Sequence, residues 1–161
     1  MNHHIPTTPQ PDPSETIMAA LAHGMTGHPE KAAALFEPFI LGGSATALGL
    51  CAALAETTVH DSRKNLPTNG AFGLLVIDPT TGKHGSVDSF PPGIRFAAQF
   101  TAAWANNDRD TAHDLFNALV RPGTEEAADA LAVGIRALFD MAVASLNNLT
   151  GRTNDTQGTA P

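Results

Sequence analysis

A short apolar run near the middle of the chain constrains the fold more than any other stretch. Residues 72–77 are rich in branched and aromatic side chains, and turn-forming residues bound them on both sides. This is typical of a buried β-strand and too short for a buried helix. Residues 78–82 contain an Asp, a Pro and a Gly that each favour a turn, and the more polar run 83–87 follows. The pattern therefore predicts a β-hairpin over residues 71–90.

The predicted hairpin has two apolar faces. Because alternate side chains of a strand point to opposite faces, Phe72 lies on one face while Leu75 and Ile77 lie on the other. An isolated two-stranded hairpin is marginal in water and leaves unpaired edges. Either the protein's own helices cover the second face, or a second molecule does. We therefore predict an association interface at Phe72, Leu75, Ile77 and Val87.

The rest of the chain between residues 14 and 149 follows a helical pattern. Apolar residues recur every three or four positions, and capping or breaking residues separate the segments. Six helices are predicted, starting near Ser14, Pro29, Ser44, Pro91, Asp108 and Thr124. The predicted fold is mainly α, with two similar three-helix units joined by the central hairpin in a single domain over residues 14–149. Residues 1–13 and 150–161 are predicted to be a disordered arm and a disordered tail, because they contain little to bury.

The two predicted helical units align without a gap when the chain is shifted by eighty residues. In this alignment Phe36 falls on Phe116, and Gly43-Ser44 falls on Gly123-Thr124. The order of helix, turn, Ala-x-x-Leu-Phe, break, hydroxyl residue and long helix is the same in both. We interpret this as an internal duplication.

Two resemblances follow from these segments. Gly27-x4-Ala32-x3-Phe36 and its counterpart ending at Phe116 resemble the helix-turn-helix of a tetratricopeptide repeat, but the repeat does not recur directly, so we interpret each as a helical hairpin. The alternative fold is thus an all-α bundle with such hairpins. Residues 91–119 resemble small uncharacterised helical proteins of GC-rich Gram-positive bacteria and their mobile elements, and this resemblance implies no activity.

Composition excludes several classes of protein. The chain has 16 acidic and 9 basic residues and a formal charge of −7, without a Lys/Arg cluster, so we expect no binding to nucleic acid. The most apolar segment, residues 45–55, is too short to cross a bilayer, and no signal peptide is recognisable. We therefore expect a soluble cytoplasmic protein that binds no membrane. Cys51 is the only cysteine, which excludes a disulfide within one chain and a cysteine zinc site.

Three residues are candidates for contact with a ligand or partner. His60 follows Glu56 by four positions, His113 stands between two aspartates, and Trp104 ends a predicted helix beside two asparagines. Each also has a structural explanation, as a helix-end or solvent-facing histidine or as a packed aromatic. The spacing of the histidines matches no metal motif, so neither a catalytic residue nor a metal or other cofactor is predicted.

These observations favour a non-enzymatic protein-protein interaction or adaptor protein that forms a homodimer. One alternative is an enzyme or small-ligand binder whose site forms between the two helical halves, because residues remote in sequence can converge in a pocket. The other is a regulator that acts through a protein partner.

Overall fold

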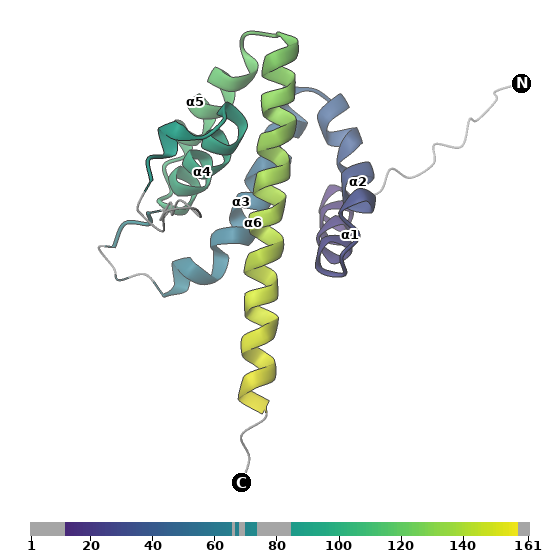
Figure 1. The fold of residues 1–161 in the computed structure, drawn as a ribbon, viewed down its shortest axis with the longest axis vertical. Helices are drawn as coiled ribbons and strands as arrows, with labels where there is room; N and C mark the ends of the chain where they lie inside the picture. The colour runs from purple at the N-terminus through teal and green to yellow at the C-terminus, as the bar shows by residue number, and fades with distance from the viewer. Residues whose placement is uncertain (1–11, 66, 68–69, 74–84, 158–161) are drawn as a thin grey trace, which may run out of the picture.

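Six α-helices and one short 3₁₀ helix make up the part of the chain that the structure describes. The computed structural model describes residues 12–65, 67, 70–73 and 85–157 (Figure 1). In chain order the elements are α1 (Pro13–Met25), α2 (Pro29–Leu41), α3 (Ser44–Lys64), the 3₁₀ helix η1 (Val87–Ser89), α4 (Pro92–Ala105), α5 (Arg109–Val120) and α6 (Glu125–Gln157).

The helix starts follow the capping signals in the sequence. Asp108 Oδ1 accepts the Thr111 N–H at 3.1 Å, and Thr124 Oγ1 accepts the Ala127 N–H at 3.3 Å. Such bonds satisfy donors that the first turn of a helix leaves open. At α1 the cap is Asp12, whose Oδ1 accepts the N–H of Ser14 at 2.7 Å. Ser14, predicted as this cap, is therefore the second residue of the helix.

The two longest helices, α3 and α6, cross at the centre of the molecule. In Figure 1, α4 and α5 lie on one side of this pair and α1 and α2 on the other. Helix α6 packs against α4, α3, α1 and α5, and so joins the two sides. The largest fully buried side chains come from five helices: Leu21, Leu50, Leu54, Val59, Phe100, Phe116 and Leu138. Burial of these apolar groups is the main force that holds the helices together.

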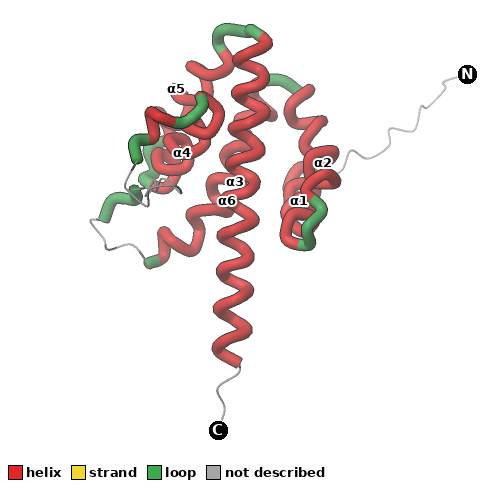
Figure 2. Tube along the Cα trace, viewed as in Figure 1, coloured by secondary structure: helices red, strands yellow, loops and turns green. Residues whose placement is uncertain are grey.

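The prediction of a central β-hairpin is wrong. The described residues contain no strand (Figure 2), and the alternative of an all-α bundle fits. The Phe72 N–H donates to Asn106 Oδ1 at 2.7 Å, and its carbonyl accepts from Asn106 Nδ2 at 3.0 Å. An amide side chain at the end of α4 thus takes the two backbone groups that a strand partner would use. Val87 lies in η1, where the Ser86 hydroxyl accepts the N–H of Asp88.

Two boundaries also differ from the prediction. Helix α6 continues to Gln157, where we predicted an end near residue 149 followed by a disordered tail. Pro38 removes a backbone hydrogen bond and was expected to kink α2 or end it early, but the helix continues through it to Leu41.

The helices of the two groups begin within one residue of matching positions, although α6 runs well past the match of α3. Helix α2 begins at Pro29 and α5 at Arg109, eighty residues later, as in the sequence alignment. The turn before each of them holds one residue with positive φ, Gly27 at 79° and Asn107 at 58°. Glycine and asparagine tolerate this conformation best. The same local geometry therefore joins α1 to α2 and α4 to α5.

Candidate functional site

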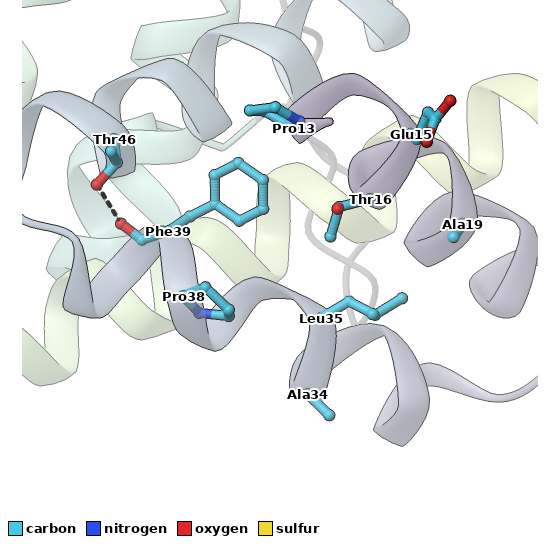
Figure 3. Close-up of a pocket in the computed structure, with 9 residues that line it drawn as sticks. All are labelled: Pro13, Glu15, Thr16, Ala19, Ala34, Leu35, Pro38, Phe39 and Thr46. Carbon is cyan, nitrogen blue, oxygen red and sulfur yellow. Dashed lines mark hydrogen bonds between the residues drawn. The ribbon is translucent and has the colours of Figure 1, made fainter. Parts of the chain in front are cut away.

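An apolar groove of about 520 Å³ runs between α1 and α2 and ends at the start of α3 (Figure 3). In Figure 3 the Phe39 and Leu35 side chains of α2 face Pro13 and Thr16 of α1 across the groove. Its remaining lining residues are Glu15, Ala19, Ala34, Pro38 and Thr46. Most of the lining is therefore carbon, with carboxylate and hydroxyl groups from only three residues.

The wall formed by α2 is held in place by its junction with α3. Thr46 Oγ1 donates to the Phe39 carbonyl at 2.7 Å, as drawn in Figure 3, and lies 2.9 Å from the Gly43 carbonyl. Pro38 has no N–H, so it cannot donate to the Ala34 carbonyl one turn earlier. The α2 wall of the groove thus presents the Phe39 ring from a backbone position that Thr46 holds, and it lacks one of the backbone hydrogen bonds of a regular helix.

The alignment by eighty residues places a second groove between α4 and α5. This groove measures about 200 Å³ and is lined by residues that include Arg95, Phe96, Gln99, Leu115 and Leu119. Phe96 stands where the first groove has Thr16, and Gln99 stands where it has Ala19. The second groove is the smaller one, and Phe96, one of the larger side chains in its lining, is buried and contacts Phe100 and Phe116. The first groove is open because its matching side chains are small.

The open groove suits an apolar guest with one positive group. Its volume falls within the range of about 300–1,000 Å³ that is typical of ligand pockets. Few polar groups line it, so burial of apolar surface would supply most of the binding free energy. Glu15 lies in the first turn of α1 and is exposed, so it can pair with a cation at that end. Because Arg95 occupies the matching position in the second half, the two grooves also differ in charge.

A second polar constellation joins α3, α4 and α5. Trp104 Nε1 donates to Glu56 Oε2 at 2.9 Å, and Arg63 Nη1 donates to Glu56 Oε1 at 3.0 Å. The Arg109 guanidinium lies over the Trp104 ring, 3.4 Å from its centroid, and Nη2 is 3.9 Å from Glu56 Oε2. Trp104 also stacks on Phe100, with ring centroids 5.8 Å apart. The Glu56 carboxylate and the two arginine side chains thus connect the Trp104 indole of α4 to α3 and α5.

The surroundings within this network shift the pKa values of Glu56 and Arg109. Partial burial raises the pKa of Glu56, but the Trp104 hydrogen bond and the charges of Arg63 and Arg109 outweigh burial and lower the pKa below its ordinary value. Burial, followed by the charge of Arg63, lowers the pKa of Arg109. Glu56 is therefore an anion near neutral pH, and its oxygens already accept hydrogen bonds. The arrangement fits a structural role better than proton transfer. We call this set of residues the clasp: Glu56, Arg63, Trp104 and Arg109.

The lowered pKa of Glu56 predicts that the free energy of unfolding depends on pH. Because folding lowers the pKa of Glu56, its contribution is fully present above the ordinary value of 4.5 and is lost as the pH falls through the folded pKa. The wild-type chain should unfold more easily below about pH 4.5, and Glu56→Gln should lack this part of the pH dependence. Urea unfolding of both chains across this range tests the prediction. A difference in unfolding free energy that stays constant with pH would contradict it.

The structure brings two of the three predicted contact residues together. Trp104 is half-buried in the clasp, and His60 Nδ1 lies 4.0 Å from Glu56 Oε1 at the edge of it. His113 is exposed on α5, apart from both the groove and the clasp. Sequence reasoning missed Arg63 and Arg109. Arg63 follows Glu56 by seven residues, two helical turns along one face, which was a signal that could have been used.

The interface predicted at the hairpin is only partly described. Phe72 and Val87 are half-buried, whereas Leu75 and Ile77 lie outside the described residues. A role of these four residues in association stays a prediction.

Cys51 is fully buried, and burial raises the pKa of its thiol to about 12. It therefore packs in the core as an unreactive thiol.

Two features are absent from the part of the chain that the structure describes. Within the described ranges, no group of three or more His, Cys, Asp or Glu side chains is placed to hold a metal ion. None of the helices in this part of the chain is both long and apolar enough to span a bilayer.

Comparisons with protein-family models, with curated proteins and with solved structures found no match. The resemblance to helical proteins of Gram-positive bacteria therefore stays a prediction.

Proposed function

We propose that the protein is a non-enzymatic interaction module that holds an amphipathic helix of a partner protein in the α1–α2 groove. The observation that carries this proposal is the pair of matched grooves: the one between α4 and α5, where Phe96 and Gln99 stand, measures about 200 Å³, whereas the one between α1 and α2 measures about 520 Å³. Filling the open groove with the protein's own side chains would have stabilised the fold through apolar burial. An open apolar groove is an expected feature of a surface that accepts a partner.

The chemistry of the groove specifies the partner helix. Phe39 and Leu35 offer contacts for apolar side chains one turn apart, the spacing by which amphipathic helices dock in grooves. Glu15 at one end favours a lysine or arginine on the partner. The formal charge of −7 also favours a basic partner over an acidic one, through faster encounter.

A variant that copies the second half into the first tests the groove. Thr16→Phe with Ala19→Gln, the filled variant, should occupy much of it with larger side chains, like Phe96 and Gln99 in the smaller groove, while α1 stays folded. The matched control makes the same two changes at exposed positions outside the groove, Thr111→Phe on α5 and Ala128→Gln on α6.

The measurement is photo-cross-linking in an extract of the native host. A benzoylphenylalanine at Ala34, an exposed residue of the groove wall, would capture the occupant, and the linked segment would be identified by mass spectrometry. We expect a basic amphipathic helix that is captured by the control and lost from the filled variant. A synthetic peptide of that helix should bind the filled variant about tenfold more weakly or worse. Capture that persists in the filled variant, or capture of a second copy of the chain, would contradict the proposal.

The related predictions from the sequence belong to the same proposal. An internal duplication, supported by the matching starts of the helices, would explain why the molecule has one large and one small groove. An absence of nucleic-acid binding agrees with the acidic composition, and a cytoplasmic location belongs to the same proposal. The alternative of a ligand site between the two halves is less well supported, because the groove of about 520 Å³ lies within one half, whereas the hollow between α2 and α6 measures about 180 Å³.

A further inference from the structure

The outer face of α6 is exposed along most of the helix. Seven exposed residues follow one another at spacings of one, three or four positions: Asp129, Ala132, Val133, Arg136, Asp140, Ala144 and Asn147. Val133 is a large apolar residue and is 44% exposed. Helix α4 borders this face, since Val133 lies close to Gly93, but all seven side chains keep exposed surface, and the carboxyl-terminal turns of α6 extend past the rest of the bundle (Figure 1). A stretch of helix without neighbours is only marginally stable in water, so we expect another molecule to cover this face.

Hollows on both sides of this face give room for another helix. One measures about 470 Å³ and is lined by Ile94 of α4 and by residues of α6 that include Val133 and Ala137. The other measures about 180 Å³ and includes Ile40 of α2, a residue that is itself exposed. Ala132 and Arg136 border both hollows. They therefore form a ridge with an apolar depression on either side, the shape into which a second helix packs.

The charges on the ridge are arranged to match a second copy. Arg136 Nε lies 2.9 Å from Asp140 Oδ1 on the same helix, with both side chains more than half exposed. An acid before a base is the better order for a pair four residues apart, so this base-before-acid pair stabilises α6 weakly. We consider an antiparallel pair of α6 helices whose two-fold axis crosses the exposed face at the level of Leu138 along the helix. In this pair Arg136 faces Asp140 of the partner subunit, and the reverse contact forms as well. A parallel pair would instead bring like charges together.

The same axis matches the rest of the face. Residues equally far from Leu138 meet, so Ala132 faces Ala144 of the partner subunit and Asp129 faces Asn147 of the partner subunit. The first contact is between small residues that let the helices approach, and the second joins a carboxylate to an amide donor. Residues 144–151 of each helix then lie beside residues 125–132 of the other. An isologous interface needs this kind of self-complementary surface.

We infer that the chain forms a two-fold homodimer through antiparallel α6 helices, with Arg136 and Asp140 paired across the axis. This interface shares no residue with the α1–α2 groove, so it stands or falls independently of the proposed function. It also differs from the hairpin interface predicted from the sequence.

Charge reversal with the full chain tests the inference. By analytical ultracentrifugation the wild type should have twice the 16.7 kDa mass of one chain. Arg136→Glu and Asp140→Lys each place like charges at both symmetric contacts, and each should weaken association about a hundredfold. An equimolar mixture of the two variants should recover the dimer, because Glu at 136 then faces Lys at 140 and the unchanged pair forms the other contact. Arg121→Glu and Asp114→Lys, the same changes at exposed sites near and on α5, should leave the dimer unchanged.

Cysteine cross-linking tests the direction of the pair. Chains with Ala132→Cys and chains with Ala144→Cys should form a disulfide when mixed under mild oxidation, and neither should do so alone. Cys51 is buried and does not compete. A wild-type monomer at every concentration, a mixture of charge variants that stays monomeric, or cross-linking of Ala132→Cys with itself would each overturn the inference. Circular dichroism of each variant separates loss of association from loss of folding.

Discussion

Phe100→Ala should lower the free energy of unfolding by about 3–5 kcal/mol, the largest effect that we expect from a single truncation in the core. Phe100 is fully buried in α4. Its ring centroid lies 5.3 Å from that of Phe96 and 5.8 Å from that of Trp104, on which it stacks. The truncation would remove both aromatic contacts and leave a cavity that rigid helices close only in part. It would also remove the support of the Trp104 ring, and so loosen the clasp around Glu56.

The matched control for this truncation is Phe39→Ala. Phe39 is only half-buried at the edge of the open groove, so the same change should cost much less. Urea unfolding followed by far-ultraviolet circular dichroism gives both free energies. Equal losses for the two variants would show that the buried aromatic row of α4 is not the centre of the core.

Two Gly→Ala substitutions should change stability in opposite directions. A Cβ at Gly93 would lie 2.8 Å from Val133 Cβ and would meet the backbone carbonyl of Ala130, so α4 and α6 would have to separate. We expect a loss of about 1–3 kcal/mol, as for other overpacked sites. Gly49 lies on the exposed side of α3, and a Cβ there would have no neighbour within 4 Å. Gly49→Ala should therefore stabilise the protein by about 0.4–1 kcal/mol through higher helix propensity and lower entropy of the unfolded chain.

Thermal and urea unfolding of the two glycine variants measure this contrast directly. The comparison is informative because the chemical change is the same and both sites are helical. If Gly93→Ala were as stable as the wild type, the close approach of α4 to α6 would have to be wrong. If Gly49→Ala were destabilising, that side of α3 would have to be covered.

The helices could be predicted from the sequence because their signals are local. Asp108 and Thr124 cap helices as predicted, and Ala32, Phe36, Ala112 and Phe116 lie in the core as the three- and four-residue spacing indicated. A helix satisfies its own backbone hydrogen bonds, so a short stretch of sequence contains most of the information that specifies it.

The hairpin prediction failed because a strand depends on a partner that the local sequence does not specify. The apolar run at residues 72–77 has high β propensity, but the backbone groups of Phe72 bond to Asn106, thirty-four positions away along the chain. Propensity is a weak guide where a distant side chain competes for the backbone. The groove was missed for a related reason. It depends on the small size of Thr16 and Ala19 opposite Phe39, a property of two packed helices and not of either one alone.

The position of α6 in the sequence has a consequence for biosynthesis. The ring of Phe139 packs edge-on against Phe36, and α6 also covers faces of α1, α3 and α4, all of which leave the ribosome first. Until α6 emerges, the apolar sides of these earlier helices have no complete shelter. This part of the nascent chain should therefore reach its native state only after α6 has emerged, and a chain that stops before α6 should be a substrate for chaperones and proteases.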